Sequence, residues 1–322
     1  MKRIQHFMVN SPVTLKQFLQ NEVSLNSDHA DFLIKIGAIY QNGQRVLENN
    51  QIQIGDLIRC HTEPKRFRSE ISWDKHLLFE NQDFVIFDKP FGLPCQASLD
   101  NRIENLLYLC SQAYKQNLLI THRLDVGTEG LIVLAKNKLF QTEFNRLLES
   151  RQVTKIYECL TTGPLLSPGR ITHWMLPHPR SPKILSALRG TREIQEHWKL
   201  CELDILQSKT LNTTKLFEKN QSQGVETKSS NSVVNHYSLQ LLTGRTHQIR
   251  AQLSFEKNPI LGDQLYGSTH FATMTEFSTP LDSPKYEWYA LKCCELKFEY
   301  QSQIFEWKTI FNPLIFKSSD FV

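Results

Sequence analysis

One stretch of the sequence, residues 121–134, joins a polar loop to a buried strand. The loop carries Arg123 and Asp125, two glycines follow, and residues 131–134 are all apolar. Glycine permits tight turns, and a rigid strand fixes the loop before it, which is where catalytic groups are commonly mounted. The pattern therefore makes Asp125 a candidate catalytic residue. An Arg-x-Asp pair alone is more often a structural ion pair, so other segments must decide.

The chain after residue 74 alternates between strand and helix patterns. Residues 85–87 form a second apolar run of strand length. Helical spacing appears in the apolar residues Phe140, Phe144, Leu147 and Leu148. These patterns predict an α+β domain over residues 74–322. Its segment 207–235 is rich in Ser, Thr, Asn, Lys and Gln, so we expect an exposed insertion without chemistry.

A smaller domain is predicted over residues 10–63. Apolar residues at helical spacing indicate two short helices, the second of which ends at Gly37. An Asn42-Gly43 turn signal and the alternation in residues 52–58 then predict short strands. The basic segment 64–73 is expected as a linker, whose cations are either solvated or in contact with phosphate.

Cysteine usage, hydropathy and charge narrow the class of protein. The seven cysteines are scattered without a Cys-x-x-Cys pair, which argues against a disulfide framework or a zinc site and fits a reducing cytoplasm. No run approaches the roughly 20 apolar residues that a bilayer span needs, and no secretory signal is recognisable, so we expect a cytoplasmic protein without a membrane contact. The net charge of +4 permits a polyanionic partner without requiring one.

Five segments resemble motifs of the RluA family of pseudouridine synthases, and they occur in the family's order. They are residues 88–94 (Asp-Lys-Pro-Phe-Gly-Leu-Pro), 121–134, 155–157 (Lys-Ile-Tyr), 242–250 (Leu-Thr-Gly-Arg-Thr-His-Gln-Ile-Arg) and 259–267. The N-terminal domain resembles an S4 RNA-binding domain. The resemblance implies an α+β fold in which a small S4-like domain precedes a catalytic domain built on a mixed, mainly antiparallel sheet with flanking helices.

The resemblance also implies an activity, which is the isomerisation of uridine to pseudouridine in structured ribosomal or transfer RNA. The enzyme is expected to act as a monomer without a cofactor or metal. Asp125 would assist departure of uracil from C1′, by covalent attack or by stabilising positive charge. Arg245 would pair with Asp125, since a neighbouring guanidinium favours the ionised carboxylate. Tyr157 would stack on the target base and help to remove the C5 proton.

Six further residues are implied as RNA contacts. They are Arg123, His122, Thr128, Lys89, Lys155 and His247. Arg123 would fill the place that the flipped uridine vacates, which offsets part of an unstacking cost of about a few kcal/mol. The chain departs from the family pattern at Val126-Gly127 and at Glu129, whose negative charge would lie near the RNA.

Two alternatives from other classes stay open. A catalytically inactive RNA-binding protein on the same scaffold is expected to lack the aspartate, which is present here as Asp125. A nucleoside or glycoside hydrolase would use Asp125 together with a second carboxylate and would release free uracil, whereas an isomerase retains the base.

Overall fold

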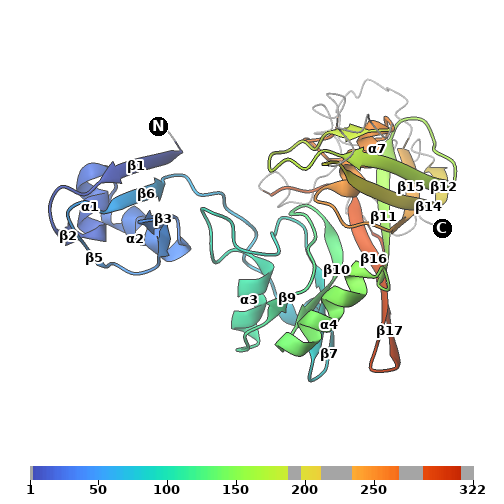
Figure 1. Cartoon of the computed structure of the whole chain (residues 1–322), viewed down its shortest axis with the longest axis horizontal. Coiled ribbons are helices and arrows are strands. Elements are labelled where there is room, and N and C mark those ends of the chain that lie inside the picture. Colours follow the sequence, from blue (N-terminus) through green and yellow to red (C-terminus); the bar gives the residue numbers. More distant parts are fainter. Residues whose placement is uncertain (1–2, 188–196, 212–233, 268–285, 313–322) are drawn as a thin grey trace, which may run out of the picture. The chain divides into compact units, whose positions relative to one another are not determined.

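The chain is divided into two compact units in the computed structural model, and each unit is built from two segments of the sequence (Figure 1). Unit 1 comprises Met1–Lys75 and Leu93–Ile120, and unit 2 comprises His76–Gly92 and Thr121–Val322. The structure describes residues 3–187, 197–211, 234–267 and 286–312. The chain passes between the two units after residues 75, 92 and 120, whereas the sequence pattern predicted one linker.

Unit 1 combines helices with a four-stranded sheet. Its helices are α1 (Leu15–Glu22), α2 (Ser27–Ile36), the short 3-10 helix η1 (Trp73–Lys75) and α3 (Leu106–Ala113). Its strands are β1 (Ile4–Met8), β2 (Val13–Thr14), β3 (Ile39–Gln41), β4 (Gln44–Val46), β5 (Gln51–Ile52), β6 (Leu57–His61) and β9 (Leu119–Ile120). The sheet has the order β1-β6-β3-β4 with antiparallel neighbours, and β2 pairs with β5.

Local capping explains where the helix pair of unit 1 begins and ends. Thr14 and Gln17 form a capping box at the start of α1, in which each side chain bonds to the other's backbone. Asn26 caps α2 by accepting a hydrogen bond from the backbone of His29. Gly37 ends α2 in the left-handed region, at a φ of 76°, which glycine adopts without steric cost. The predicted pair of helices is therefore confirmed.

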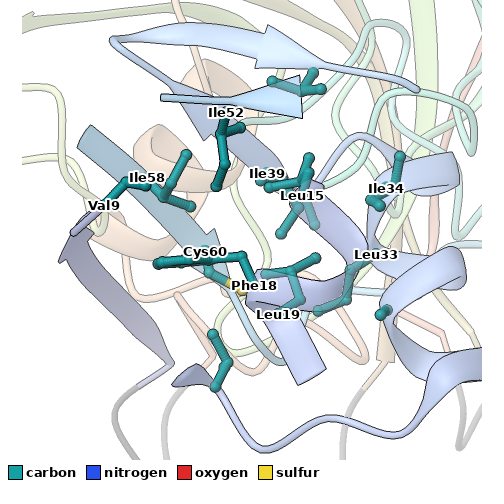
Figure 2. Close-up of a cluster of buried hydrophobic side chains, with 14 of the residues drawn as sticks. Val9, Leu15, Phe18, Leu19, Leu33, Ile34, Ile39, Ile52, Ile58 and Cys60 are labelled. Carbon is teal, nitrogen blue, oxygen red and sulfur yellow. The ribbon is translucent and has the colours of Figure 1, made fainter. Parts of the chain in front are cut away.

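The core of unit 1 lies where the helix pair meets the sheet (Figure 2). Side chains from both helices and from the central strands fill it; they include Leu15, Phe18, Leu19, Leu33, Ile34, Ile39, Ile58 and Cys60. Each large apolar side chain buried in this way stabilises the fold by roughly 1.5–3 kcal/mol. The partly buried Ile103, from the second segment of unit 1, packs on the same core.

The basic segment 64–73 is tied into unit 1. Arg66 donates to both oxygens of Glu104, from Nε at 2.9 and 3.1 Å and from Nη2 at 2.5 Å. Glu104 also accepts from the backbone N–H of Phe67 and from Asn101, both at 2.8 Å. Trp73 is buried as well. The expected linker therefore packs on residues 98–104 and holds the two segments of unit 1 together.

Within the described residues, unit 2 is built on one large mixed sheet with two helices. Its helices are α4 (Lys138–Glu149) and α7 (Gln248–Phe255). Its strands are β7 (Leu77–Glu80), β8 (Phe84–Lys89), β10 (Glu129–Ala135), β11 (Thr154–Thr162), β12 (Gly169–Met175), β13 (Leu185–Ser186), β14 (Lys199–Leu211), β15 (Val234–Leu241), β16 (Leu291–Tyr300) and β17 (Gln303–Lys308). The order is β13-β12-β14-β15-β11-β16-β10-β8-β7, with β17 paired to β16. Only β10 and β16 run parallel, so the expected mixed, mainly antiparallel sheet is confirmed for the strand pairs just given.

Aromatic stacking fixes α4 against this sheet, beside β10 (Figure 1). Phe140 stacks on Phe84 of β8 with ring centroids 4.5 Å apart, and Phe144 meets Phe298 of β16 edge-on at 4.9 Å. Such pairs contribute about 0.5–1.5 kcal/mol beyond the area that they bury. The helix predicted from the spacing of Phe140 and Phe144 is confirmed, as are the strands predicted at residues 85–87 and 131–134.

The expected polar insertion begins later than its composition indicated. Residues 207–211 continue β14 and pair with β15, so the strand pattern overrides the polar composition there. Residues 234 and 235 at the other end of the expected insertion belong to β15, and residues 212–233 lie outside the described residues. All seven cysteines are buried and form no disulfide bond, including the adjacent Cys293 and Cys294. Across the described ranges, no helix is long and apolar enough to span a bilayer.

The buried carboxylate of Glu104 predicts a pH dependence of stability. Burial raises its pKa, but the hydrogen bonds from Arg66, Phe67 and Asn101 outweigh burial and lower the pKa below its usual 4.5. A folded-state pKa below the unfolded value stabilises the fold above about pH 4.5 and loses that stabilisation as the pH falls through the folded pKa. We therefore expect Glu104→Gln to destabilise unit 1 by about 1–3 kcal/mol at pH 7 and to flatten the stability loss below pH 4.5.

Denaturant unfolding between pH 3 and pH 7 measures both effects. Glu48→Gln is the matched control, because Glu48 is exposed and forms no ion pair within the described residues. An equal acid sensitivity in the Glu104→Gln variant and the wild type would show that another group controls the transition.

Candidate active site

The Asp125 loop is held between two strands of unit 2. Gly130 of β10 lies opposite Lys89 of β8 on one side and opposite Cys293 of β16 on the other. At the start of the loop, the Thr121 hydroxyl donates to the carbonyl of Val133 at 2.6 Å. A turn then closes at Asp125, whose carbonyl accepts from the backbone N–H of Thr128 at 3.2 Å. Strand register and local hydrogen bonds therefore fix the loop from both ends.

Two glycines let this loop sit close to its neighbours. A Cβ on Gly127 would lie 2.5 Å from Cε1 of Tyr289, which no real Cβ contact allows. A Cβ on Gly130 would lie 2.2 Å from the carbonyl oxygen of Cys293, and its φ of +111° already disfavours other residues. The departure from the family pattern at Val126-Gly127 thus has a local reason, because Gly127 makes room for the Tyr289 ring.

A buried arginine pairs with Asp125. Nη1 of Arg250 lies 3.4 Å from Oδ2 of Asp125, and the arginine side chain is only 2% exposed. Asp263, which is fully buried, binds the same guanidinium in a two-pronged pair at 2.7 and 2.9 Å. Glu287 lies 3.7 Å from Nη1. Arg250 is therefore a buried cation shared by three carboxylates. Asp263 makes the closest contacts with it, and the side chain of Asp125 is 24% exposed.

Two tyrosine rings complete the surroundings of Arg250. The guanidinium carbon lies 4.2 Å from the ring centre of Tyr289 and 5.1 Å from that of Tyr266. Burial alone would lower the pKa of Arg250, but the hydrogen bonds of Asp263 and the nearby negative charges raise it above its ordinary value. Burial and the charge of Asp125 raise the pKa of Tyr289, so this phenol keeps its proton at neutral pH. The arrangement holds a permanent positive charge against Asp125.

The start of α7 places Arg250 in this position. Gln248, the first residue of the helix, accepts hydrogen bonds from the Thr243 hydroxyl at 2.9 Å and the Arg245 backbone N–H at 3.0 Å. His247 precedes the helix with a φ of 57°. The tight turn over residues 243–247 thus ends at Gln248, and the first helical turn points Arg250 inward.

The predicted pairing of Asp125 with Arg245 is wrong, because Arg250 takes that place. Arg245 is exposed, and its Nε donates to the carbonyl of Leu200 at 3.4 Å. The segment 242–250 carries two arginines, and the sequence does not say which one faces inward. The helix start at Gln248 decides this, because it buries Arg250 beside Ile249 and leaves Arg245 on the turn.

The predicted RNA contacts of Lys89 and Thr128 are also corrected, because both side chains are buried and engaged inside the protein. Lys89 is fully buried, and its ammonium donates to the carbonyls of Pro90 at 3.0 Å and Val126 at 3.3 Å. The buried hydroxyl of Thr128 bonds to the phenol oxygen of Tyr289 at 3.2 Å. These two side chains hold the Asp125 loop from inside the fold and are not available at the surface.

His122 shapes the same loop from its other end. Its Nε2 accepts a hydrogen bond from the backbone N–H of Val133 at 3.2 Å, and its ring stacks on Phe144. Burial, aided by the charge of Lys155, lowers the pKa of His122 to about 3. His122 is therefore neutral at physiological pH and acts as a structural acceptor.

The remaining predicted residues lie around the site. Arg123 is exposed and has no ion pair within the described ranges. The Nζ of Lys155 lies beside Gly244, 3.9 Å from where its Cβ would be, and burial lowers the pKa of this lysine. His247 lies 3.2 Å from the Tyr266 hydroxyl, and burial lowers its pKa while Asp125 opposes that shift.

Tyr157 lies two strands from the Asp125 loop. It sits on β11 opposite Cys293 of β16, and Gly130 is opposite the same cysteine from the β10 side. Two strand spacings separate Tyr157 from Gly130, which is about 10 Å. Its side chain is buried, 4% exposed, and it hydrogen-bonds the Cys293 thiol.

The residues that the sequence patterns did not reveal are those around Arg250. Asp263 and Tyr266 stood in the motif segment 259–267, but no feature of the sequence linked them to the arginine. Tyr289 lies in no motif. The one sequence feature that points to it is Gly127, because a glycine before a buried strand can indicate that another side chain packs closely there. Within the described part of the chain, no three His, Cys, Asp or Glu side chains gather as a metal site.

Comparison with known proteins finds relatives of this chain. A model of the RNA pseudouridylate synthase family matches residues 83–255. RNA pseudouridine synthase 6, chloroplastic, of Oryza sativa subsp. japonica is 33% identical over 252 residues, which cover 76% of this chain and 50% of the rice protein. Ribosomal large subunit pseudouridine synthase D of Haemophilus ducreyi is 30% identical over 242 residues, covering 73% of this chain and 65% of that protein.

A solved structure shows the same fold. The human RNA Pseudouridylate Synthase Domain Containing 4 superposes with a TM-score of 0.53 at 21% identity, over 76% of this chain and 91% of the human chain. The chain spans about half the length of its plant relatives, 50% of the rice protein and 49% of the Arabidopsis thaliana one.

The close approach of Tyr289 to Gly127 predicts a specific sensitivity. We expect Gly127→Ala to lower the free energy of unfolding by about 1–3 kcal/mol, because a methyl group would overlap a buried ring that cannot swing away. Gly244→Ala is the matched control and is expected to stay within about 0.5 kcal/mol, since the nearest atom is 3.9 Å away. Denaturant unfolding compares the two variants, and equal stability of both would mean that the ring does not lie against Gly127.

Proposed function

The chain belongs to the RNA pseudouridylate synthase family, and from this we propose that it isomerises uridine to pseudouridine within structured ribosomal or transfer RNA. The observation that carries the proposal is the Asp125 carboxylate, partly exposed on a fixed loop and paired with the buried Arg250 inside the segment that matches the family. One oriented, ionised carboxylate is the group that this reaction requires.

The proposed reaction needs little from the protein besides this carboxylate. The N1–C1′ bond of uridine breaks, the uracil turns in the site, and a C5–C1′ bond forms. The proton lost from C5 balances the proton gained at N1, so the product is an isomer. Asp125 would assist the departure of uracil, either by attacking C1′ or by stabilising its positive charge, and is restored at the end. Arg250 would keep Asp125 oriented throughout and would balance its negative charge.

The exposed groups near the loop are proposed to handle the RNA. Arg123 would take the place of the flipped uridine in its stem, since it is exposed and without an ion pair among the described residues. Lys155 and His247, which flank the turn over residues 243–247, would contact the RNA strand. We assign Tyr157 to the target base; because it is only 4% exposed, stacking requires part of its cover to move.

Unit 1 is proposed to act as an S4-like RNA-binding module. The helix pair, the Asn42-Gly43 turn and the short strands over residues 10–63 support this assignment. The name of the Haemophilus ducreyi relative refers to the large ribosomal subunit, which makes ribosomal RNA the first substrate to test. A cytoplasmic location is proposed from the seven unbonded cysteines, although the plant relatives are named chloroplastic.

One observation keeps a hydrolase as the second candidate. Glu287 lies on the same guanidinium as Asp125, so a second carboxylate is close to the loop. Glycosidases use such pairs, with one carboxyl group protonating the leaving group. Mass spectrometry of the RNA and of the released bases separates the two reactions, because a hydrolase releases free uracil and an isomerase leaves the RNA mass unchanged.

The assignment of Asp125 predicts a loss of chemistry without a loss of docking. We expect Asp125→Asn to lower pseudouridine formation by more than about 1,000-fold while changing RNA affinity by less than about tenfold. Pseudouridine mapping on ribosomal RNA from cells that lack the protein, incubated with each purified variant, measures the activity. Glu149→Gln, an exposed carboxylate at the end of α4, is the matched control and should leave it unchanged. Normal turnover by Asp125→Asn would remove the assignment.

The two arginines of the segment 242–250 are expected to behave differently. Arg250→Lys should lower kcat by about 100-fold or more, since lysine cannot bind Asp263 through two nitrogens and still reach Asp125. Arg245→Met should mainly raise KM for RNA, because this arginine lies on the surface. Steady-state kinetics separates the two effects, and thermal unfolding checks that each variant is folded. An equal loss of kcat in Arg245→Met would mean that the catalytic pairing differs from the one described.

A further inference from the structure

The four-stranded sheet of unit 1 carries a row of basic and aromatic residues on the face away from the core. The strand register places His6 opposite Arg59, Arg59 opposite Tyr40, and Tyr40 opposite Arg45. The row therefore crosses all four strands, β1, β6, β3 and β4. Neighbours along the strands, among them Ile39, Ile58 and Cys60, point into the core in Figure 2. Because side chains alternate along a strand, the row lies on the opposite face.

The arginines of this row are positioned without a carboxylate. The Arg59 guanidinium lies 4.0 Å from the ring centre of Tyr40, and that of Arg45 lies 5.1 Å from the same ring. Arg45 donates to the carbonyls of Gly37 at 2.9 Å and Ser98 at 2.6 Å, which are neutral acceptors. Within the described residues, neither arginine has an ion pair. Their positive charges are therefore fixed in place and not neutralised.

One carboxylate beside this face, that of Asp100, is held by neutral donors, and its charge opposes the lowering of the pKa of His61. Asp100 accepts from the backbone N–H of Lys65 at 2.6 Å and from the Ser98 hydroxyl at 2.7 Å. Along the helix pair, by contrast, Lys16 is paired with Asp31 at 2.5 Å. Arg45 and Arg59 thus have no carboxylate partner within the described residues, whereas Lys16 on the helix pair has one.

Two buried nitrogens on this face have no hydrogen-bond partner among the described residues. They are Nε of Arg59 and Nε2 of His61, whose residue is only 7% exposed. A buried polar group left without a partner costs about 1–3 kcal/mol, so native proteins keep few of them. Burial and the charge of Arg59 lower the pKa of His61 and favour its neutral form. The two nitrogens leave hydrogen-bonding capacity unused next to the fixed cations.

Exposed apolar side chains border the row. Ile4, Met8 and Leu57 are 45%, 61% and 56% exposed, and they share this face by strand alternation. A purely electrostatic surface does not need them. A nucleic-acid strand does use them, because its bases offer flat faces that pack on apolar and aromatic side chains while phosphates meet the cations.

We propose that the exposed β1–β6 part of this sheet face binds the RNA backbone, with Arg59 and His6 contacting a phosphate and Ile4, Met8 and Leu57 receiving the neighbouring bases. The β3–β4 part is covered, since the Tyr40 hydroxyl donates to the carbonyl of Leu99 at 2.8 Å. The planar guanidinium of Arg59 matches two phosphate oxygens, and the Tyr40 ring holds that plane in place. The proposal rests on the proposed function only for the identity of the nucleic acid. It places the RNA on the sheet of unit 1 and not on its helix pair.

The test is a binding measurement on the full chain carrying Asp125→Asn, which prevents turnover. The probe is a fluorescein-labelled RNA stem-loop with a uridine-rich loop, measured by anisotropy at several salt concentrations. We expect Arg59→Gln to weaken binding by about 5- to 10-fold near 0.1 M salt and to reduce the slope of log K against log salt by about 1. Arg59→Lys keeps the charge and should retain the slope with a smaller loss of affinity.

A matched control shows whether the loss of any exposed positive charge in unit 1 weakens binding equally. Lys35→Gln removes an exposed charge from α2 and should change affinity by less than about twofold, and thermal unfolding confirms that each variant folds. Unchanged affinity and slope in Arg59→Gln, or a larger effect of Lys35→Gln, would overturn the proposal. The proposal would also be overturned if Arg59→Gln weakened binding of a labelled decaglutamate peptide and left RNA binding unchanged. The partner of this face would then be an acidic protein.

Failure of the proposed function gives a different result. If wild-type protein binds the stem-loop through Arg59 but forms no pseudouridine in ribosomal or transfer RNA, the binding surface stands and the isomerase assignment fails. If pseudouridine forms and the Arg59 variants bind RNA as the wild type does, the isomerase assignment stands and the proposed binding surface fails.

Discussion

The shared guanidinium of Arg250 is the interaction on which the site depends. Placing a cation in a side chain that is 2% exposed is costly, and the cost is offset only by close partners with good geometry. Asp263 supplies the two-pronged pair, and the rings of Tyr266 and Tyr289 cover the faces. With those contacts made, the remaining electrostatic attraction acts on Asp125 and Glu287, which both lie near Nη1. The carboxylate on the loop is thus oriented by a cation that cannot move or lose its charge.

The Asp125 loop is held by polar side chains that the sequence pattern predicted as substrate contacts. Lys89 donates to backbone carbonyls inside the protein, and Thr128 bonds to Tyr289. Both are polar residues close to the candidate catalytic residue Asp125, a position where substrate-binding residues are also expected. Their burial gives them the opposite role, since a buried polar group must be satisfied within the fold.

Local features were predictable from the sequence where the physics is local. The helix ending at Gly37, the helix containing Phe140 and Phe144, and the loop carrying Asp125 all follow from spacing, caps and glycines. The partner of Asp125 was not predictable, because it depends on which residue of the segment 242–250 begins α7. Tyr289 comes from a segment more than 150 residues away from the loop, and only tertiary packing joins them. The division of the chain escaped prediction for the same reason, since the Arg66–Glu104 pair joins residues from two segments.

The alternation of the chain between the two units bears on how the protein folds as it is synthesised. Domains generally fold as units, the N-terminal one first, while the chain emerges. Here unit 1 is incomplete until residue 120 has emerged, because Glu104 and Ile103 belong to it. Strand β8 emerges earlier and can pair at once with β7, yet its other edge has no partner until β10 begins at Glu129, roughly 40 residues later. A ribosome that pauses between these two points would therefore expose a strand edge prone to aggregation, and a chaperone that shields β8 would act before either unit is whole.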